Sequence, residues 1–209
     1  MITVIFDMDG TLINSSNAIC AAVNEIREEL GLKALENKLI MQTINTPGKD
    51  FAKILYNIDD FKNSTFKDGF ERYFVKHYRQ SVILYEGVVE VLEFLRAKSC
   101  FLAIATNAPH SSLNEILGKH KILFYFDKLV GVADNIEPKP DPAMIKLIRA
   151  EAKFEKTIFV GDSDKDRFAA QNAKIPYIHA RWGEDECGED EFKNAKELRA
   201  LLERFMNEG

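Results

Sequence analysis

Short apolar runs alternate with stretches of helical spacing over most of the chain. The first run, residues 1–6, is rich in β-branched side chains and predicts a buried strand. Similar runs predict four further strands, at 101–105, 128–132, 157–160 and 177–180. Between and after these strands, apolar residues at helical spacing predict helices at 86–97, 109–119, 142–152, 164–173 and 194–206. Strands that alternate with helices favour an α/β fold, in which a mostly parallel sheet is covered by helices on both faces.

One long section interrupts this alternation. Residues 17–80 show no strand pattern but have helical spacing in four pieces, at 18–30, 36–44, 49–57 and 61–80. Ser15, Ser16 or Asn17 is expected to cap the first helix, and Gly31 to end it. The aromatic residues of the last piece indicate a packed helical core. We therefore expect a smaller helical domain inserted at 17–80, and an α/β core domain made of 1–16 plus 81–209.

Composition narrows the class of protein. The 209 residues carry a formal charge of -5, which argues against a general nucleic-acid surface. The sequence shows neither an apolar run of the roughly 18 residues that span a membrane nor an export signal. Cys20, Cys100 and Cys187 are far apart and odd in number, as expected for reduced thiols, and the acidic stretch 184–191 is interpreted as a solvated loop. We expect a soluble cytoplasmic protein without a nucleic-acid or membrane partner.

Polar side chains gather where the predicted strands end. Carboxylates follow the first and fourth strands, a hydroxyl and an amide follow the second, and an ammonium lies in the loop after the third. These groups are Asp7 and Asp9, Thr106 and Asn107, Lys139, and the trio Asp162, Asp164 and Asp166. Parallel strands bring their carboxyl ends to one edge of a sheet, where open α/β folds bind ligands. The sequence therefore predicts a common site at this edge.

The charges of these groups suggest what the site binds. Three or four carboxylates in a partly dry crevice would repel one another strongly. A hard divalent cation removes the conflict, and ligation by oxygen alone favours Mg²⁺. Lys139 and the donors of Thr106 and Asn107 then suit an anionic substrate group, and phosphate fits because it bridges metal and donors. Each signal also has a structural interpretation, with Asp162 as a helix cap, Thr106-Asn107 as a turn and Lys139 as a surface residue.

Four segments, taken in order, resemble the motifs of one enzyme superfamily. They are Phe6-Asp-Met-Asp-Gly-Thr-Leu12, Ile104-Ala-Thr-Asn107, Lys139-Pro-Asp-Pro142 and Val160-Gly-Asp-Ser-Asp-Lys-Asp166. Together they are similar to the four motifs of the haloacid dehalogenase-like superfamily, and the resemblance covers essentially the whole chain. It implies a Rossmann-like α/β core. The insertion at 17–80 looks like the cap domain of the branch that contains phosphoglycolate phosphatases and beta-phosphoglucomutases.

The resemblance implies separate roles for the carboxylates. Asp7 would attack phosphorus and become a transient aspartyl-phosphate. Asp9 would be the general acid for the leaving group and then the base for the hydrolytic water. A Mg²⁺ cofactor would be held by Asp7, the backbone carbonyl of Asp9 and Asp162, with Asp166 supporting the waters of the metal.

The resemblance also implies how the substrate is bound. Thr106, the backbone that follows it at Asn107, and Lys139 would bind the phosphoryl oxygens of a small-molecule phosphate ester, phosphoglycolate-like or a sugar phosphate. Phosphomutases of the capped branch usually have Val at the position of Thr11, which favours a phosphatase. Relatives close to phosphoglycolate phosphatase usually have Asp at the position of Asn14, so the substrate stays open, as does the oligomeric state.

Two other interpretations stay open beside a Mg²⁺-dependent phosphatase. A beta-phosphoglucomutase-like phosphomutase would return the phosphoryl group of the same aspartyl-phosphate to a bound sugar phosphate instead of to water. A non-catalytic signalling or binding module would use the phosphate pocket without turnover. The presence of Asp9 argues against the module, because binding alone has no need of a general acid.

Overall fold

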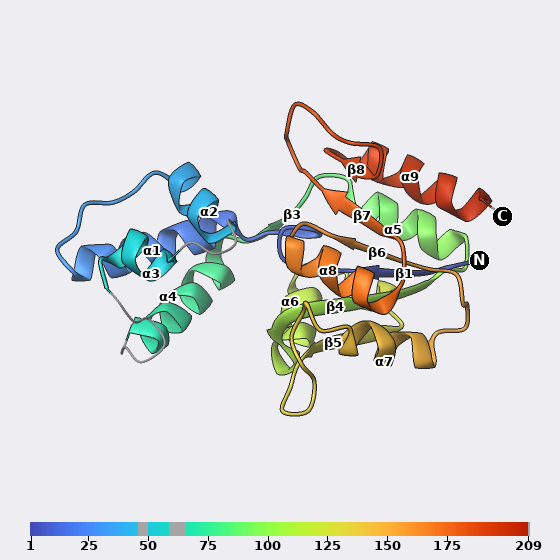
Figure 1. Cartoon of the computed structure of the whole chain (residues 1–209), viewed down its shortest axis with the longest axis horizontal. Coiled ribbons are helices and arrows are strands. Elements are labelled where there is room, and N and C mark those ends of the chain that lie inside the picture. The colour runs from blue at the N-terminus through green and yellow to red at the C-terminus, as the bar shows by residue number, and fades with distance from the viewer. Residues whose placement is uncertain (46–49, 59–65, 209) are drawn as a thin grey trace. The chain divides into compact units, whose positions relative to one another are not determined.

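The structure is a computed structural model and describes residues 1–45, 50–58 and 66–208 (Figure 1). The chain forms two compact units: the larger consists of Met1–Ile13 with Leu84–Gly209, and the smaller of Asn14–Ile83. The chain passes from one unit to the other at 13/14 and at 83/84, whereas the sequence predicts these boundaries at 16/17 and 80/81. A capping role for the smaller unit stays a prediction.

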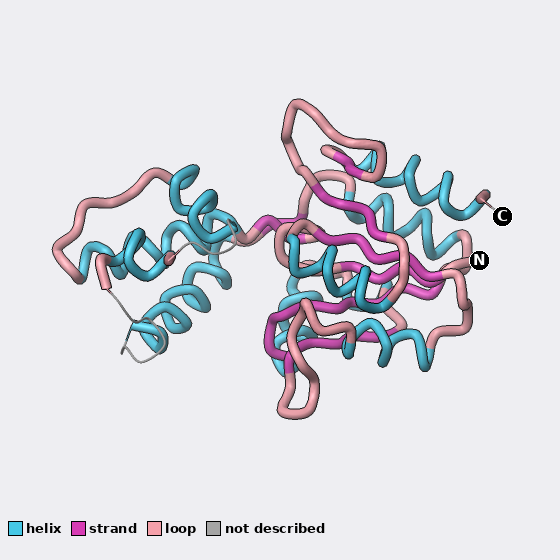
Figure 2. The backbone as a smooth tube through the Cα atoms, viewed as in Figure 1, coloured by secondary structure: helices cyan, strands magenta, loops and turns pink. Residues whose placement is uncertain are grey.

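The larger unit is built on a six-stranded sheet with the strand order β5-β4-β1-β6-β7-β8 (Figures 1 and 2). Its strands are β1 (Thr3–Phe6), β4 (Phe101–Pro109), β5 (Lys128–Val132), β6 (Thr157–Gly161), β7 (Tyr177–Ala180) and β8 (Glu191–Phe192). The described pairings in this sheet are parallel, and β1 lies between β4 and β6. The carboxyl ends of β1, β4 and β6 therefore lie side by side at one edge.

Both faces of the sheet are buried. The helices of this unit are α5 (Val88–Ala97), α6 (Leu113–Lys119), α7 (Ala143–Glu151), α8 (Asp164–Ala173) and α9 (Ala195–Asn207), with 3₁₀ turns at His110–Ser112 and Leu123–Tyr125. Ile5 and Phe159 pack with Ile148 of α7 in one apolar core. Their strand neighbours Val4 and Val160 point to the opposite face, because side chains alternate along a strand, and they are fully buried too. The predicted α/β fold class is confirmed.

The strands differ from the prediction at their ends. β4 runs past Ala105 to Pro109, with a register shift against β5 in between, where the polar residues had predicted a turn. Three strands of two residues were not predicted: β8 and the pair β2 (Ile13–Asn14) and β3 (Ile83–Leu84), which form a separate small sheet. A run of two residues is too short to show an alternating pattern. Because β8 begins at Glu191, the acidic stretch ends in the sheet.

The smaller unit is helical, as the sequence predicts. Its helices are α1 (Ser16–Glu29), α2 (Asn37–Asn45), α3 (Phe51–Tyr56) and α4 (Phe66–Ser81). Ile26 and Leu55 lie in its buried apolar core together with Tyr73, which belongs to the predicted aromatic stripe. The starts of the pieces predicted at 49–57 and 61–80, including Phe61, lie outside the described residues.

Helix α1 begins differently from the prediction. Ser15 is the N-cap residue, but its side chain makes no capping hydrogen bond. Instead, Oδ1 of Asn14 accepts a hydrogen bond from the backbone N–H of Ser16 at 3.2 Å and another from the Ser16 hydroxyl. Asn side chains commonly form such turns with the backbone two residues on. Gly31, at a φ of +67°, follows the end of the helix as expected.

The structure can be compared with the expectations for the cysteines and for membrane-spanning segments. Cys20 and Cys100 are buried, Cys187 is partly exposed, and all three are free thiols. Among the residues that the structure describes, no helix combines the length and apolar character needed to cross a bilayer. A cytoplasmic location stays a prediction.

Candidate functional site

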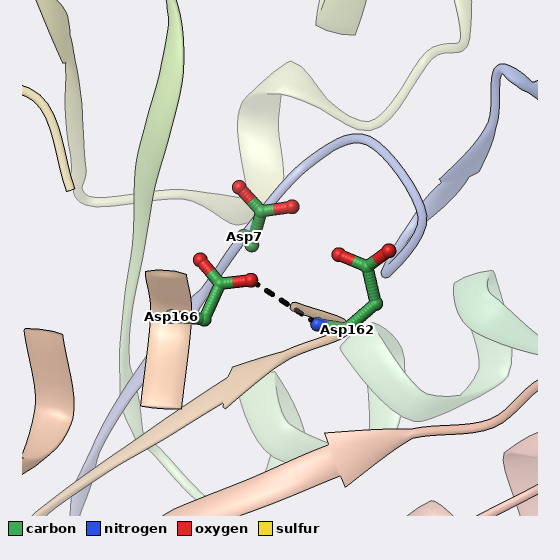
Figure 3. Close-up of side chains that lie close together, drawn as sticks. All are labelled: Asp7, Asp162 and Asp166. Carbon is green, nitrogen blue, oxygen red and sulfur yellow. Dashed lines mark hydrogen bonds between the residues drawn. The ribbon is translucent and has the colours of Figure 1, made fainter. Parts of the chain in front are cut away.

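Three carboxylates meet at the carboxyl edge of the sheet. Asp7 follows β1, Asp162 follows β6, and Asp166 lies in the first turn of α8. One oxygen of each lies within 4.8 Å of the others, and Figure 3 shows the three side chains converging. Because β1 and β6 are parallel neighbours in the sheet, their ends place Asp7 and Asp162 side by side. The structure thus brings together three of the carboxylates that the sequence singled out.

Asp166 is held rigidly by the start of its own helix. Its Oδ2 accepts hydrogen bonds from the backbone N–H of Ser163 at 3.0 Å and from the Ser163 hydroxyl at 2.6 Å. A longer bond of 3.3 Å comes from the backbone N–H of Asp162 (Figure 3). Ser163 in turn caps α8 in a reciprocal capping box. The capping interpretation given to Asp162 belongs instead to Ser163, and Asp162 keeps its carboxylate for the cluster.

Lys139 enters the cluster as its cation. Its ammonium nitrogen lies 2.5 Å from Oδ1 of Asp7 and also donates a hydrogen bond to Oδ1 of Asp166. The residue is 4% exposed, so the surface interpretation of Lys139 is wrong. The ammonium also lies 5.3 Å from the ring centroid of Phe159, within cation–π range.

Asn107 positions Lys139. The backbone N–H of Lys139 donates to Oδ1 of Asn107 at 2.8 Å, and Nδ2 of Asn107 donates to the carbonyl oxygen of Lys139 at 3.0 Å. Thr106 is buried, and its hydroxyl oxygen accepts from the backbone N–H of Ala108 at 3.2 Å. A hydroxyl that accepts in this way can still donate its proton to another oxygen. The Asn107 side chain therefore holds the backbone of Lys139. The predicted phosphate contact would come from the Thr106 hydroxyl and from the backbone N–H that follows it.

The cluster is short of positive charge. Burial raises the pKa of Asp7 to about 7; Lys139 opposes this rise, whereas Asp166 and Asp9 add to it. Burial, followed by repulsion from Asp7 and Asp166, raises the pKa of Asp162 to about 8. Burial alone would lower the pKa of Lys139, but the carboxylates of Asp7 and Asp166 more than offset it, so that this pKa is raised. One ammonium thus does not balance three carboxylates, and the oxygen-only donor set fits an added hard divalent cation.

The loop after β1 passes closely over this cluster. Gly10 has a φ of +85°, and a Cβ atom at this position would lie 2.0 Å from Oδ2 of Asp162. Asp9, in the same loop, is half-buried and acts electrostatically on Asp7. Its carboxylate is not one of the three that converge. Gly10 therefore permits the close approach of the loop, while Asp9 stands next to the cluster rather than in it.

Two aromatic residues outside the four motifs, Tyr85 and Trp182, hold this loop by hydrogen bonds. The rings of Tyr85 and Trp182 are stacked with their centroids 4.4 Å apart. The indole N–H of Trp182 donates to the carbonyl oxygen of Thr11 at 3.0 Å, and the backbone N–H of Tyr85 donates to that of Leu12, also at 3.0 Å. Burial, together with Asp162 and Asp9, raises the pKa of Tyr85 to about 12. The Trp182-Gly183 pair just after the last predicted strand, which resembles an aromatic-Gly pair of the phosphatase branch, is the sequence signal for this contact.

Comparison with known proteins places the chain in a family. The family model described as haloacid dehalogenase-like hydrolase matches residues 4–180. A phosphoglycolate phosphatase of Rhodobacter capsulatus is 29% identical over 179 residues, which are 83% of this chain and 81% of that protein. A phosphoglycolate phosphatase of Aquifex aeolicus is 29% identical over 189 residues, 88% of this chain and 86% of that protein.

Solved structures agree with this assignment. A protein of Haemophilus somnus assigned as a phosphoglycolate phosphatase superposes with a TM-score of 0.77 at 25% identity, over 95% of this chain and 96% of that one. A Thermotoga maritima protein assigned as a beta-phosphoglucomutase gives a TM-score of 0.75 at 25% identity, over 98% and 99%. The predicted superfamily is confirmed: the chain belongs to the haloacid dehalogenase-like hydrolases, as a phosphoric monoester hydrolase.

Proposed function

We propose that the chain hydrolyses a small phosphorylated metabolite, phosphoglycolate-like or a sugar phosphate, with Mg²⁺ as cofactor and Asp7 as nucleophile. The observation that carries this proposal is the buried cluster itself, with three carboxylates within 4.8 Å and Lys139 against two of them. Such a cluster does not stabilise the folded chain by itself, because unbalanced buried charge costs free energy. It suits a cation together with an anionic substrate group.

The residues proposed to hold the metal are Asp7, Asp162 and the backbone carbonyl of Asp9, with Asp166 acting through water. Mg²⁺ retains several waters and takes few protein oxygens, which matches this set. When bound, the ion supplies positive charge that neutralises the phosphoryl oxygens.

Asp7 and Asp9 then divide the chemistry between them. A carboxylate oxygen of Asp7 forms a bond to phosphorus while the bond from phosphorus to the ester oxygen breaks. Asp9 gives its proton to that departing oxygen, so the alcohol leaves neutral. In the second step Asp9 takes a proton from water as the water oxygen attacks phosphorus. The bond to Asp7 breaks, and inorganic phosphate and the Asp7 carboxylate are released.

Lys139 and Thr106 are proposed to bind the phosphoryl group. The ammonium already lies 2.5 Å from the nucleophile, so it can stabilise negative charge on phosphoryl oxygens that approach Asp7. The Thr106 hydroxyl and the backbone at Asn107 would donate to the same oxygens. The predicted cap role of the smaller unit, selecting the rest of the substrate, belongs to this proposal as well.

A phosphomutase is the second candidate, because one structural neighbour is assigned as a beta-phosphoglucomutase. Thr11, where mutases of the branch usually have Val, favours hydrolysis. The test is a panel of phosphate esters, including phosphoglycolate and β-glucose 1-phosphate, assayed with and without Mg²⁺ for free phosphate and for isomerised sugar phosphate. We expect Mg²⁺-dependent phosphate release. Isomerisation without release would establish the mutase instead, and no reaction with any ester would favour a binding module.

A further inference from the structure

Strand β7, the parallel neighbour of β6, carries two polar side chains that belong to none of the four motifs. Tyr177 and His179 are two residues apart and therefore share a face of the strand. The Tyr177 hydroxyl oxygen lies 3.3 Å from the carbonyl oxygen of Ser163 and 2.8 Å from Nδ1 of His179. His179 is 8% exposed, so the contact is made away from bulk water.

The direction of these hydrogen bonds follows from the chemistry of the groups. A carbonyl oxygen can only accept, so the single hydroxyl proton of Tyr177 is donated to Ser163. Nδ1 of His179 must then carry a proton and donate it to the Tyr177 oxygen. Burial, aided by Arg181 and Arg167, lowers the pKa of His179, which keeps the imidazole neutral and compatible with a single proton on Nδ1.

Ser163 links this pair to the metal site. It stands in the chain next to Asp162, and both its backbone N–H and its hydroxyl donate to Oδ2 of Asp166. The Ser163 carbonyl oxygen accepts from the backbone N–H groups of Asp166 and Arg167, both at 3.1 Å, and the Tyr177 hydroxyl adds a third hydrogen bond at 3.3 Å. Tyr177 therefore ties β7 to a residue whose N–H, hydroxyl and carbonyl oxygen all bond to Asp166.

We propose that Tyr177 and His179 are positioning residues of the metal site, which hold Asp162 and Asp166 through Ser163 at the spacing a divalent cation requires. This inference rests on the proposed function, because it assigns the cluster to a metal. Groups that hydrogen-bond a metal ligand directly typically contribute about 10- to 100-fold to metal affinity. Tyr177 acts through Ser163, so we expect an effect at the lower end of that range.

The competing explanation is that Tyr177 only fills space. Its ring packs edge-on against Phe159, with centroids 6.1 Å apart. Tyr177→Phe keeps that ring and removes only the hydroxyl, so it separates positioning from packing. A control is Tyr125→Phe, because Tyr125 lies in the same unit and its hydroxyl donates to Glu93 at 3.3 Å rather than to a residue next to the cluster.

Mn²⁺ binding to the full metal-free chain, measured by electron paramagnetic resonance, tests the proposal, since Mn²⁺ prefers the same oxygen ligands as Mg²⁺. We expect Tyr177→Phe to raise the Mn²⁺ dissociation constant about tenfold, while the metal-free chain still unfolds in one transition at a slightly lower melting temperature, because the Nδ1–H of His179 loses its acceptor. Tyr125→Phe should bind like the wild type. In assays, Tyr177→Phe should need more Mg²⁺ but approach the wild-type kcat at saturation.

Variants of His179 test the positioning role independently, even if Tyr177→Phe does not fold. His179→Ala removes the donor to Tyr177 and should weaken Mn²⁺ binding, whereas His179→Asn places an N–H near the position of Nδ1 and should restore it. Wild-type Mn²⁺ affinity in both Tyr177→Phe and His179→Ala would overturn the positioning role alone. A wild-type protein that binds no Mn²⁺ would overturn the metal site of the proposed function, and the positioning role with it.

Discussion

Lys139 brings one positive charge into a buried group of three carboxylates, and the acid–base behaviour of the site follows from that ratio. The raised pKa values of Asp7, to about 7, and Asp162, to about 8, mean that the metal-free protein keeps protons at neutral pH. Both carboxyls have an ordinary value of 3.8. A bound cation and these protons therefore compete for the same oxygens.

This competition predicts how stability depends on pH. Between about pH 4 and pH 8 the folded metal-free chain holds protons that the unfolded chain has released, so its stability falls as the pH rises through that window. At the upper end of this pH window, Mg²⁺ has fewer protons to displace from the carboxyl groups of Asp7 and Asp162. We expect Mg²⁺ to raise the melting temperature more at pH 8 than at pH 5.5, measured by scanning calorimetry.

Two Asp→Asn variants control this measurement. Asp162→Asn removes one of the shifted groups and should reduce both the pH dependence and the gain from Mg²⁺. Asp164→Asn should change neither, because the Asp164 side chain is 43% exposed and pairs with Arg167 on the helix surface. An equal gain from Mg²⁺ at the two pH values would contradict the assignment of the metal to this cluster.

At the scale of single residues, the charged groups of the site could be predicted from the sequence, whereas the residues that hold them could not. Asp7 and Asp162 could be predicted because they directly follow apolar strands, and Asp166 and Lys139 because they lie in the helix start or loop that follows such a strand. Their partners could not. The hydrogen bond from Tyr177 to Ser163 joins residues brought together by the packing of β7 beside β6, and no local pattern encodes such a contact.

At the scale of elements, the extension of β4 beyond Ala105 matters most for the site. It carries Asn107 to the backbone of Lys139, where the amide makes two hydrogen bonds of 2.8 and 3.0 Å. The prediction ended this strand at Ala105 because polar residues followed. The register shift against β5 allows the strand to continue through them. Regular strands and helices were thus predicted from periodicity, whereas this irregular end and the two-residue strands were not.

Asn107→Ala tests the importance of this extension. Both bonds to the Lys139 backbone are lost, and the ammonium is no longer fixed against Asp7. Since misplacing a catalytic group by about 1 Å can cost on the order of 100-fold, we expect kcat for phosphate release to fall at least about tenfold.

Asn172→Ala is the matched control for that variant. Asn172 also holds this loop, because its Nδ2 donates to the carbonyl oxygen of Pro140 at 3.1 Å, but it does so from the exposed surface of α8. Its loss should leave kcat nearly unchanged. Equal effects of the two variants would show that Asn107 has no special part in positioning Lys139.

At the scale of the whole molecule, the described residues of each unit form an apolar core of their own. Ile148 belongs to the core between the sheet and helices α7 and α8, and Ile26 to the core of the smaller unit. The sequence predicts an inserted section from its lack of strands, because helical spacing without strands cannot extend a parallel sheet. The four motifs, by contrast, belong entirely to the larger unit.

Separate cores predict separate local stabilities. Ile26→Ala should destabilise the smaller unit by about 2–5 kcal/mol through the lost contacts and the cavity left behind. Hydrogen exchange should then speed up in α1 and α4, while the amides of β1 and β4 stay protected. Ile148→Ala is the reciprocal control and should do the reverse. If either variant loosened both units alike, the chain would unfold as one cooperative body.

The central claim is that Asp7 attacks phosphorus, and a comparison of Asp7→Asn with Asp164→Asn tests it most directly. Both variants exchange a carboxylate for an amide of the same size, one in the buried cluster and one on the surface. Phosphate release from the best ester of the panel would be measured at saturating Mg²⁺. We predict that Asp7→Asn, still folded by its melting temperature, loses at least about a thousandfold in kcat, while Asp164→Asn keeps the wild-type rate. Phosphate release by Asp7→Asn at the wild-type rate would contradict the account.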